Sequence, residues 1–418
     1  MESRSLLTDL FAAAVAAADP TMGMKRHLPA PPHEGRTVVV GAGKGAAQMA
    51  AALERLWPKP LTGVVVTRYG FACPTQSIEV LEASHPVPDA AGLIGARRLE
   101  ETIIHLTEKD LVIALICGGG SALLPAPPDG VTLEDEIALN KALLASGAPI
   151  SAMNVVRKHL STIKGGRLAA KTQARVVSLI VSDIPGDNPA FVASGPTIPD
   201  ASTRQDAIAI VEQYRLKLPD AMLAHLHSPA ADAPKVDDPI FARHEHFIVA
   251  SAAKSLEAAA EAARTQGVAA QILSDSIEGE AREAALVHAA IAREILLRDR
   301  PFAKPVVLLS GGETTVTLRG KHGRGGRNGE FALAVALAID GFDITVLAAD
   351  TDGIDGSEQN AGAFADGTTV RRLRALGLDG AKLLLENDSF SGFAALGDAF
   401  HTGPTGTNVN DFRAVLVT

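Results

Sequence analysis

The chain has 418 residues, of which 47% are hydrophobic and 4% aromatic, and its formal net charge at pH 7 is −9. This length exceeds what one ordinary hydrophobic core supports, so we expect two domains. The negative charge argues against nucleic acid or an anionic membrane as partners, and no apolar run reaches the length of a membrane span. Two cysteines without metal-ligand spacing fit a reducing compartment. We therefore expect a cytoplasmic protein that binds neither nucleic acid nor membranes.

Short β-branched runs alternate along the chain with Ala- and Leu-rich helical stretches. After an Ala-rich first helix, strands are predicted at 37–40, 63–67, 111–117, 176–181, 246–250, 270–273, 305–309, 344–349 and 414–417. Helical patterns lie between them, at 46–56, 90–106, 134–146, 254–265 and 279–297. Fully apolar strands separated by helices indicate parallel sheets that are covered on both faces.

A stretch with three prolines and no apolar periodicity, residues 228–239, marks the domain boundary. The sequence therefore predicts two α/β/α domains with mainly parallel sheets. The first is a Rossmann-like domain over residues 1–232, and the second covers residues 240–418. The active site is expected in the cleft between the two domains.

The first glycine-rich turn, GAGKGA at 41–46, directly follows an apolar strand. It matches the dinucleotide fingerprint G-x-G-x-x-[G/A] in form. That fingerprint also needs an acidic residue near the end of the second strand, where this chain has Arg68. Arginine could meet a 2′-phosphate, so NADP stays open. Lys44 within the turn is better explained as a point charge aimed at a phosphate or carboxylate group.

A second turn, Gly118-Gly119-Gly120-Ser121, follows the strand at 111–117. Consecutive glycines before a helix can present several N–H groups to an anion. The alternative is a tight turn in which Ser121 caps the helix. The next basic helical segment carries Arg157 and Lys158, which are ordinary surface charges if taken singly. Beside two anion-binding turns they become candidate ligands.

A third loop, 321–330, places two arginines and a lysine among glycines, immediately before a helical pattern at 331–338. Guanidinium groups bind carboxylate and phosphate oxygens through a bidentate fork, and a helix N-terminus also favours anions. We therefore expect this loop to hold a small anion. A solvated basic turn is the alternative.

Acidic residues follow several predicted strands, with Asp183, Glu313 and Asp352 at three strand ends. In open α/β sheets, carboxylates at the carboxyl ends of strands bind the Mg²⁺ that accompanies phosphate groups. Local turns that use an Asp side chain compete with this interpretation.

Taken together, these loops resemble the class II glycerate kinase family, whose C-terminal half is called the MOFRL domain. The matching segments span the chain in order: VGAGKG at 40–45, SHPVPD at 84–89, CGGGS at 117–121, NVVRKHLS at 154–161, SDIPGD at 182–187, LSGGET at 309–314, GGRN at 325–328, TDGIDG at 351–356 and TGPTGTNVND at 402–411. The resemblance implies phosphorylation of D-glycerate to 2-phosphoglycerate, with ATP as the donor and Mg²⁺ as the metal.

The resemblance also implies that Lys44 and Arg327 are the essential lysine and arginine of the family, and these are the catalytic candidates. The expected substrate and nucleotide ligands are Gly41, Gly43, Gly118, Gly119, Gly120, Ser121, Arg157, Lys158, Gly325, Gly326, Asn328 and Asn408. The expected metal ligands are Asp183, Glu313 and Asp352.

Two other functions stay open. Some members of the family are labelled hydroxypyruvate reductases, and an NAD(P)H-dependent reductase would use the turn at 41–46 together with Arg68. A non-enzymatic sensor that closes on a sugar acid or a phosphate is the third hypothesis, although it would have little use for strand-end carboxylates. A homodimer also stays open.

Overall fold

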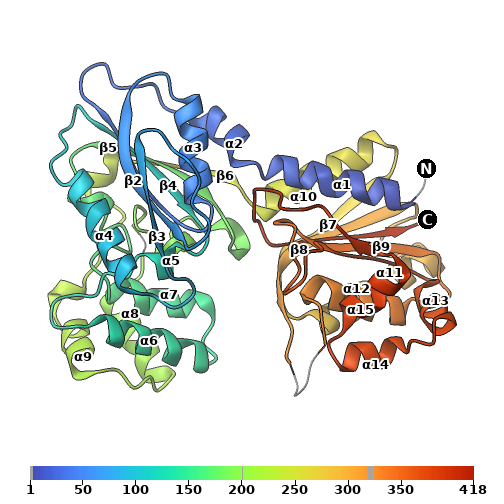
Figure 1. Ribbon diagram of the computed structural model, residues 1–418. Helices are drawn as coiled ribbons and strands as arrows, with labels where there is room; N and C mark the ends of the chain where they lie inside the picture. The colour runs from blue at the N-terminus through green and yellow to red at the C-terminus, as the bar shows by residue number, and fades with distance from the viewer. Residues whose placement is uncertain (1–2, 200, 319–322) are drawn as a thin grey trace. The chain divides into compact units, whose positions relative to one another are not determined.

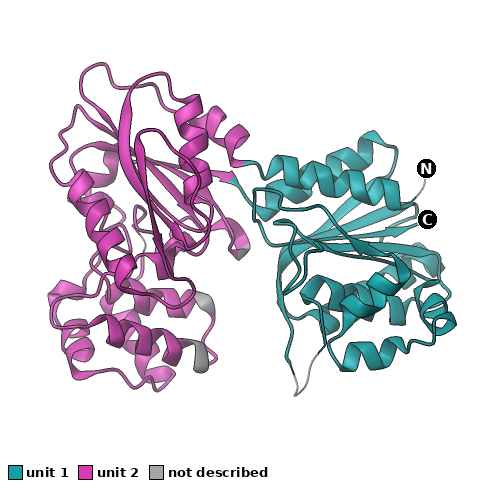
Figure 2. Cartoon of the chain, in the orientation of Figure 1, with its two compact units in different colours: residues 1–19, 250–418 teal, residues 20–249 magenta. Residues whose placement is uncertain are grey.

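The computed structural model describes residues 3–199, 201–318 and 323–418, and the chain forms two compact units (Figure 2). The N-terminal unit is Pro20–Val249, and the C-terminal unit combines Met1–Asp19 with Ala250–Thr418. The sequence places the boundary within 228–239, whereas the structure divides the chain after Asp19 and after Val249. No helix in the described ranges is long and apolar enough to cross a membrane.

The first helix, α1 (Ser3–Ala17), packs with the C-terminal unit rather than with the residues that follow it. Its buried face, which includes Leu7, Leu10 and Phe11, joins one cluster with the apolar face of α10 (Ala252–Thr265). An amphipathic helix buries its apolar face against any complementary apolar surface of the protein. The position of α1 in the sequence therefore does not show which part of the chain it packs against.

The N-terminal unit has a six-stranded sheet in the order β3-β2-β1-β4-β5-β6 (Figure 1). The β3–β2, β2–β1, β1–β4 and β4–β5 pairings are all parallel. The strands are β1 (Thr37–Ala42), β2 (Leu61–Arg68), β3 (Ile78–Ala83), β4 (Leu111–Cys117), β5 (Arg175–Val181) and β6 (Glu245–Ala250). Because β1 and β4 are buried along their whole length, they read as continuous apolar runs. The predicted Rossmann-like fold of this half is confirmed.

Helices α2 to α9 belong to this unit, and α6 to α9 form an apolar cluster of their own beside the sheet. Their bounds are α2 (Pro20–His27), α3 (Ala46–Leu56), α4 (Ala90–Ile103), α5 (Gly120–Leu123), α6 (Leu133–Ala145), α7 (Ile150–His159), α8 (Arg204–Gln213) and α9 (Asp220–Leu226). Short 3₁₀ turns lie at Ala169–Lys171, Pro185–Asp187, Val192–Ser194, Pro229–Ala231 and Pro239–Arg243.

The C-terminal unit has a mixed sheet in the order β11-β10-β9-β12-β8-β7. Its strands are β7 (Ala269–Glu280), β8 (Val306–Thr315), β9 (Ile344–Asp350), β10 (Gly362–Asp366), β11 (Ala399–Phe400) and β12 (Asp411–Val417). Strands β7 and β8 are parallel, but β12 runs antiparallel to both β8 and β9, and β10 runs antiparallel to β9 and β11. Four strands therefore point one way, and β10 and β12 point the other way. An apolar run predicts a buried strand but does not reveal its direction.

Helices cover both faces of this second sheet, so the predicted α/β class holds for both units. α1 and α10 lie on one face, while α11 (Ala281–Arg298) and α12 (Arg327–Ala338) lie on the other, with α13 (Thr369–Ala375), α14 (Gly380–Leu385) and α15 (Ser389–Leu396) beside them (Figure 1). Successive side chains of β8 point to opposite faces of the sheet. Val307 packs with α1 and α10, whereas Leu308 packs with α11 and α12.

A buried ion pair between Lys164 and Glu136 contributes to the stability of the N-terminal unit. The Lys164 ammonium lies 3.0 Å from a Glu136 carboxylate oxygen, and the two side chains are 2% and 7% exposed. Removing one partner leaves an uncompensated buried charge, so we expect Lys164→Met to lower the free energy of unfolding by about 3–5 kcal/mol. The double variant Lys164→Met/Glu136→Leu should lose much less. Denaturant titration measures both.

The exposed pair Arg98–Glu79 provides the control, since its side chains are 45% and 46% exposed. Arg98→Met should leave the free energy of unfolding almost unchanged. Equal losses for Lys164→Met and the double variant would contradict the interpretation.

Candidate active-site clusters

In the N-terminal unit, the strand order reverses between β1 and β4, which are neighbours in the sheet. Open α/β sheets bind ligands outside the carboxyl ends of the strands at such a switch point. The turn at 43–46 follows β1, and the turn at 118–121 follows β4. The two glycine turns therefore lie where this fold places ligands.

The backbone of the first turn is already hydrogen-bonded within the protein. The N–H groups of Gly43 and Lys44 donate to the carbonyls of Val66 and Gly118, at 3.1 and 2.8 Å. The Gly45 N–H donates to the Cys117 sulfur at 3.2 Å. These donors are not free for a phosphate, so the Lys44 side chain is what this turn offers to a ligand.

Close packing explains two glycines that the sequence assigns to ligand binding. Gly43 has φ +137°, and a Cβ atom there would lie 2.3 Å from the Cys117 sulfur. A Cβ atom at Gly41 would lie 2.5 Å from the Leu115 carbonyl oxygen. In this structure, Gly41 and Gly43 allow β1 and its turn to approach β4.

Side chains from three loops surround the second turn. A Cβ atom at Gly119 would lie 3.0 Å from Cγ of Lys44 and 3.1 Å from Nε2 of His85, and one at Gly118 would lie 1.9 Å from Oδ2 of Asp183. Glycine is thus required at both positions for these groups to converge. The structure brings Lys44 and Asp183 to one place, as the sequence suggests, and adds His85.

The His85 imidazole is neutral at pH 7. Burial, and then the positive charges of Lys44 and Arg68, lower the pKa of His85 to about 4. The group therefore offers one hydrogen-bond donor and one acceptor rather than a second positive charge.

The basic helical segment separates into distinct environments. Lys158 is fully buried, with its ammonium 4.6 Å from the centre of the Phe191 ring. The Arg157 Nε donates to Oδ1 of Asn140 at 2.8 Å. Neither group is an ordinary exposed surface charge.

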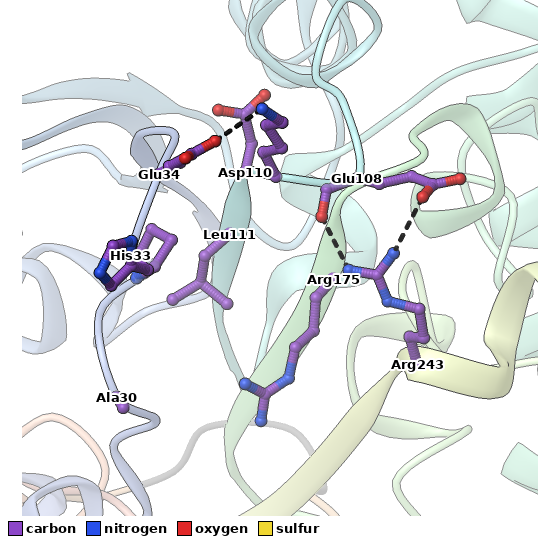
Figure 3. Close-up of a pocket in the computed structure, with 10 residues that line it drawn as sticks. Ala30, His33, Glu34, Glu108, Asp110, Leu111, Arg175 and Arg243 are labelled. Atoms are coloured by element: carbon purple, nitrogen blue, oxygen red, sulfur yellow. Dashed lines mark hydrogen bonds and ion pairs between the residues drawn. The ribbon is translucent and has the colours of Figure 1, made fainter.

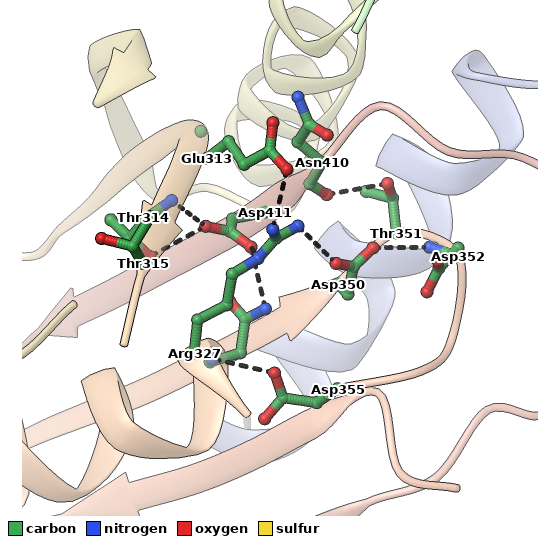
Figure 4. Close-up of polar contacts among 12 residues, drawn as sticks. Glu313, Thr314, Thr315, Arg327, Asp350, Thr351, Asp352, Asp355, Asn410 and Asp411 are labelled. Carbon is green, nitrogen blue, oxygen red and sulfur yellow. Dashed lines mark hydrogen bonds and ion pairs between the residues drawn. The ribbon is translucent and has the colours of Figure 1, made fainter. Parts of the chain in front are cut away.

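In the C-terminal unit, the Arg327 guanidinium is bound by three carboxylates (Figure 4). Its Nε donates to Asp411 at 2.6 Å, one Nη donates to Glu313 at 3.0 Å and the other donates to Asp350 at 2.7 Å. Asp350 and Asp411 are buried, whereas the Glu313 side chain is 55% exposed.

Strand direction explains this arrangement. Asp350 ends β9 and Asp411 begins β12, and the two residues are paired in the antiparallel ladder. Asp411 is also paired with Gly312 of β8, which places it next to Glu313. Since β12 runs against its two neighbours, its first residue lies at the edge where β8 and β9 end.

The pKa values of Arg327 and Asp350 are both raised in this cluster. Burial alone lowers the pKa of Arg327, but Asp411, Asp350 and Glu313 outweigh burial and raise it, so the arginine stays charged. Burial, together with the nearby charge of Asp352, holds the pKa of Asp350 well above its usual range. The second oxygen of Asp411 accepts from the N–H and the hydroxyl of Thr314, both at 3.1 Å, and from the buried Arg413.

The N-terminus of α12 holds a carboxylate of the chain itself. Asp355 accepts from the N–H groups of Asn328 and Gly329 at 2.9 and 2.7 Å. Burial raises the pKa of Asp355 to about 6, although these two bonds act in the opposite direction. A Cβ atom at Gly326 would lie 2.4 Å from Asp355, so this glycine makes room for the carboxylate. Gly325 precedes it with φ +145°.

The remaining residues predicted for the third loop and its surroundings occupy different places. Asn328 is buried, and its Nδ2 donates to Asp411 at 2.9 Å. Asn408 lies beside Asp352, with its Nδ2 3.4 Å from a carboxylate oxygen. Lys321 and His322 of the same motif lie outside the described residues.

The three predicted metal ligands belong to two units, because Asp183 lies in the N-terminal unit and Glu313 and Asp352 lie in the C-terminal unit. Within residues 3–199, 201–318 and 323–418, no group of three or more His, Cys, Asp or Glu side chains could hold a metal ion by itself. Any metal at either cluster would need further ligands from a substrate or water.

A cavity of about 400 Å³ lies at the other edge of the N-terminal sheet, where β4 and β5 begin (Figure 3). Four of its charged lining residues form two ion pairs, Lys109 with Glu34 at 2.6 Å and Arg243 with Glu108 at 3.8 Å, and Arg175 pairs with Glu245 outside the lining. The glycine turns follow the opposite ends of the strands, so this cavity is separate from the candidate site.

Asp350, Asp355 and Asp411 are not among the residues predicted from the sequence, although Asp355 lies in the segment 351–356 and Asp411 ends the segment 402–411. Asp350 lies at the end of an apolar strand, as the predicted metal ligands do. The rule that selects acidic residues at strand ends therefore also applies to Asp350. Asp411 begins a strand, and only an antiparallel β12 brings it to the site.

Comparisons with known proteins cover both halves of the chain. Residues 6–227 match a domain of unknown function, DUF4147, and residues 306–411 match the MOFRL family. A D-glycerate 2-kinase from Thermotoga maritima is 40% identical, over 99% of this chain and 98% of its own length. A relative from Agrobacterium vitis with the provisional name hydroxypyruvate reductase is 49% identical, over 100% of this chain and 95% of its own.

A solved structure shows the same architecture. The crystal structure of a glycerate kinase from Thermotoga maritima superimposes with a TM-score of 0.90 at 38% identity, and covers 99% of both chains. Agreement in sequence and in fold over the full length, together with both family matches, establishes the relationship. The chain therefore belongs to the family of DUF4147–MOFRL proteins that includes the glycerate 2-kinases.

Proposed function

We propose that this protein is a kinase that transfers the γ-phosphoryl group of ATP to D-glycerate and yields 2-phosphoglycerate. The observation that carries the proposal is the full-length similarity to a D-glycerate 2-kinase. The two clusters of side chains support it, because each offers a fixed positive charge at the edge of a sheet.

Phosphoryl transfer needs positioning and neutralisation of negative charge more than covalent chemistry by the protein. Lys44 and Arg327 are the cations that we assign to this role, toward the phosphoryl oxygens or the glycerate carboxylate. The Lys44 ammonium acts as a point charge, whereas Arg327 offers a planar fork whose direction its carboxylate partners fix.

The three partners of Arg327 divide into two kinds. Asp350 and Asp411 are buried, so they hold the guanidinium permanently. Glu313 is more than half exposed and occupies a single Nη. An incoming anion can replace Glu313 without opening the core, so we assign this side of the guanidinium to the substrate.

The acids near Arg327 fit a Mg²⁺ ion that is shared with a phosphate-bearing ligand. Mg²⁺ binds oxygen atoms and commonly uses one or two protein carboxylates, with phosphate oxygens and waters as the other ligands. Glu313 and Asp352 are partly exposed carboxylates in this unit, and Asp183 is a third beside Lys44. We propose Glu313 and Asp352 as metal ligands in this unit, and Asp183 as a metal ligand at the cluster beside Lys44. When bound, Mg²⁺ would neutralise charge on the phosphoryl group.

A reductase is the second candidate, because the Agrobacterium vitis relative carries that name. Dinucleotide-binding turns present free N–H groups to the pyrophosphate, and an acidic residue binds the ribose. Here the N–H groups of Gly43, Lys44 and Gly45 are used within the protein, and β2 ends at Arg68, whose guanidinium lies 4.1 Å from the centre of the Phe71 ring. These contacts favour the kinase.

A product assay separates the two candidates. We expect purified protein with D-glycerate, ATP and Mg²⁺ to form 2-phosphoglycerate, as followed by phosphorus NMR, and we expect a chelator to stop the reaction. Hydroxypyruvate with NADPH should give no oxidation of the cofactor. NADPH oxidation without phosphoryl transfer would contradict the proposal.

The role of the Arg327 fork can be tested by a change that keeps its charge. Arg327→Lys should lower kcat about 100-fold or more, because an ammonium cannot contact Asp350, Asp411 and a ligand in the same geometry. Steady-state kinetics measure the effect.

Arg324→Lys is the matched control, since Arg324 lies three residues away, is largely exposed and pairs with Glu358. Its kcat should stay close to that of the parent protein. Similar losses in both variants would show that the loop tolerates no change, and would remove the specific role of Arg327.

A further inference from the structure

A series of side-chain hydrogen bonds leads from the half-buried Arg157 to the second glycine turn. The Arg157 Nη1 lies 3.4 Å from Oδ1 of Asn154, and the same Oδ1 lies 3.2 Å from the Ser194 hydroxyl. The Ser194 hydroxyl lies 2.8 Å from the hydroxyl of Ser121. Asn154 and Ser194 are 4% and 1% exposed, whereas Ser121 is only partly buried.

Arg157 determines the donor and the acceptor of each hydrogen bond in this series. A guanidinium group has only N–H donors, so the Asn154 atom that faces it is the carbonyl oxygen. The same oxygen faces Ser194, whose hydroxyl must therefore donate to it. A hydroxyl has one proton, so Ser194 can only accept from Ser121.

The Ser121 hydroxyl therefore donates its single proton to Ser194, and only its lone pairs remain for a ligand. A ligand atom at Ser121 must be a hydrogen-bond donor. Carboxylate and phosphate oxygens are acceptors, so this hydroxyl is not part of an anion site. It also does not cap α5, whose N-cap residue is Gly119.

The backbone around Ser194 is built to hold this arrangement. Ala193 and Ser194 have φ of 52° and 59°, a left-handed conformation that is uncommon for residues other than glycine and that recurs at functional sites. The Gly165 N–H donates to the Ser194 carbonyl at 3.0 Å. A Cβ atom at Gly120 would lie 2.6 Å from Cβ of Ala193, so this glycine lets the two turns meet.

We propose that Ser121 is a specificity residue that accepts a hydrogen bond from a hydroxyl group of the three-carbon acid substrate. This inference rests on the proposed kinase function. The amide oxygen of Asn154 does not take up a proton. This series of hydrogen bonds therefore orients a substrate hydroxyl and does not deprotonate it. The hydroxyl that is not phosphorylated fits this role, and for a 2-phosphoglycerate product it is the 3-hydroxyl.

D-lactate, which is D-glycerate without the 3-hydroxyl, provides the test. Ser121→Ala should lower kcat/KM for D-glycerate about tenfold, as expected for the loss of one neutral hydrogen bond. The inhibition constant of D-lactate against D-glycerate turnover should stay nearly unchanged. Equal weakening of both compounds would overturn the assignment, and so would an effect of Ser121→Ala that disappears when ATP is replaced by 2′-deoxy-ATP.

Two changes at Asn154 test the direction of the bonds separately from packing. Asn154→Asp keeps an oxygen that can only accept, so the preference for D-glycerate over D-lactate should survive. Asn154→Leu removes the acceptor and frees the Ser194 proton to turn toward Ser121, so the preference should fall about tenfold. Equal preference in the Asp and Leu variants would contradict the proposed polarity.

Ser178→Ala is the matched control. It removes a hydroxyl from another buried pair of the same unit, in which the Ser178 and Thr197 oxygens lie 2.7 Å apart. This variant should lose stability without changing the preference for D-glycerate. A parent protein without phosphoryl transfer would refute the kinase function, whereas an active kinase whose Ser121→Ala variant keeps the preference would refute this inference alone.

Discussion

The antiparallel course of β12 is the constraint on which the C-terminal cluster depends. Only a strand that runs against β8 and β9 can place its first residue, Asp411, beside the last residue of β9 and beside Gly312 near the end of β8. With Asp350 and Glu313 it fixes the Arg327 guanidinium, while Asp355 holds the first turn of α12. Sheet register, helix position and side-chain direction thus determine the orientation of one arginine.

The two units use their glycine-rich turns in the same way. At the turn 43–46 and at the start of α12, glycine allows a close approach within the protein, and backbone N–H groups are bound by groups of the chain itself. Lys44 lies in the first turn and Arg327 begins α12, and these are the two cations that we propose to meet a ligand. Glycine-rich loops are commonly interpreted as phosphate-binding loops, but these two set the positions of side chains.

The sequence predicts much of the fold, because buried parallel strands such as β1, β4 and β5 appear as apolar runs between helices. It misses β3, whose pattern of Ile78 to Ala83 includes two glutamates, and also β10 and β11, which are short. The sequence brings Lys44 and Arg327 forward through their unusual place among glycines. It cannot show that Arg327 is bound by Asp411, since that contact depends on the direction of a strand 84 residues later.

The packing of α1 against α10 has a consequence for synthesis of the protein. A chain made from its N-terminus exposes Leu7, Leu10 and Phe11 long before α10 exists, because the whole unit Pro20–Val249 is made between them. That unit can fold on its own schedule, as domains generally do on the ribosome. The apolar face of α1 therefore stays uncovered until α10 has been synthesised. The C-terminal unit cannot complete its packing before then, although it contains the first helix of the chain.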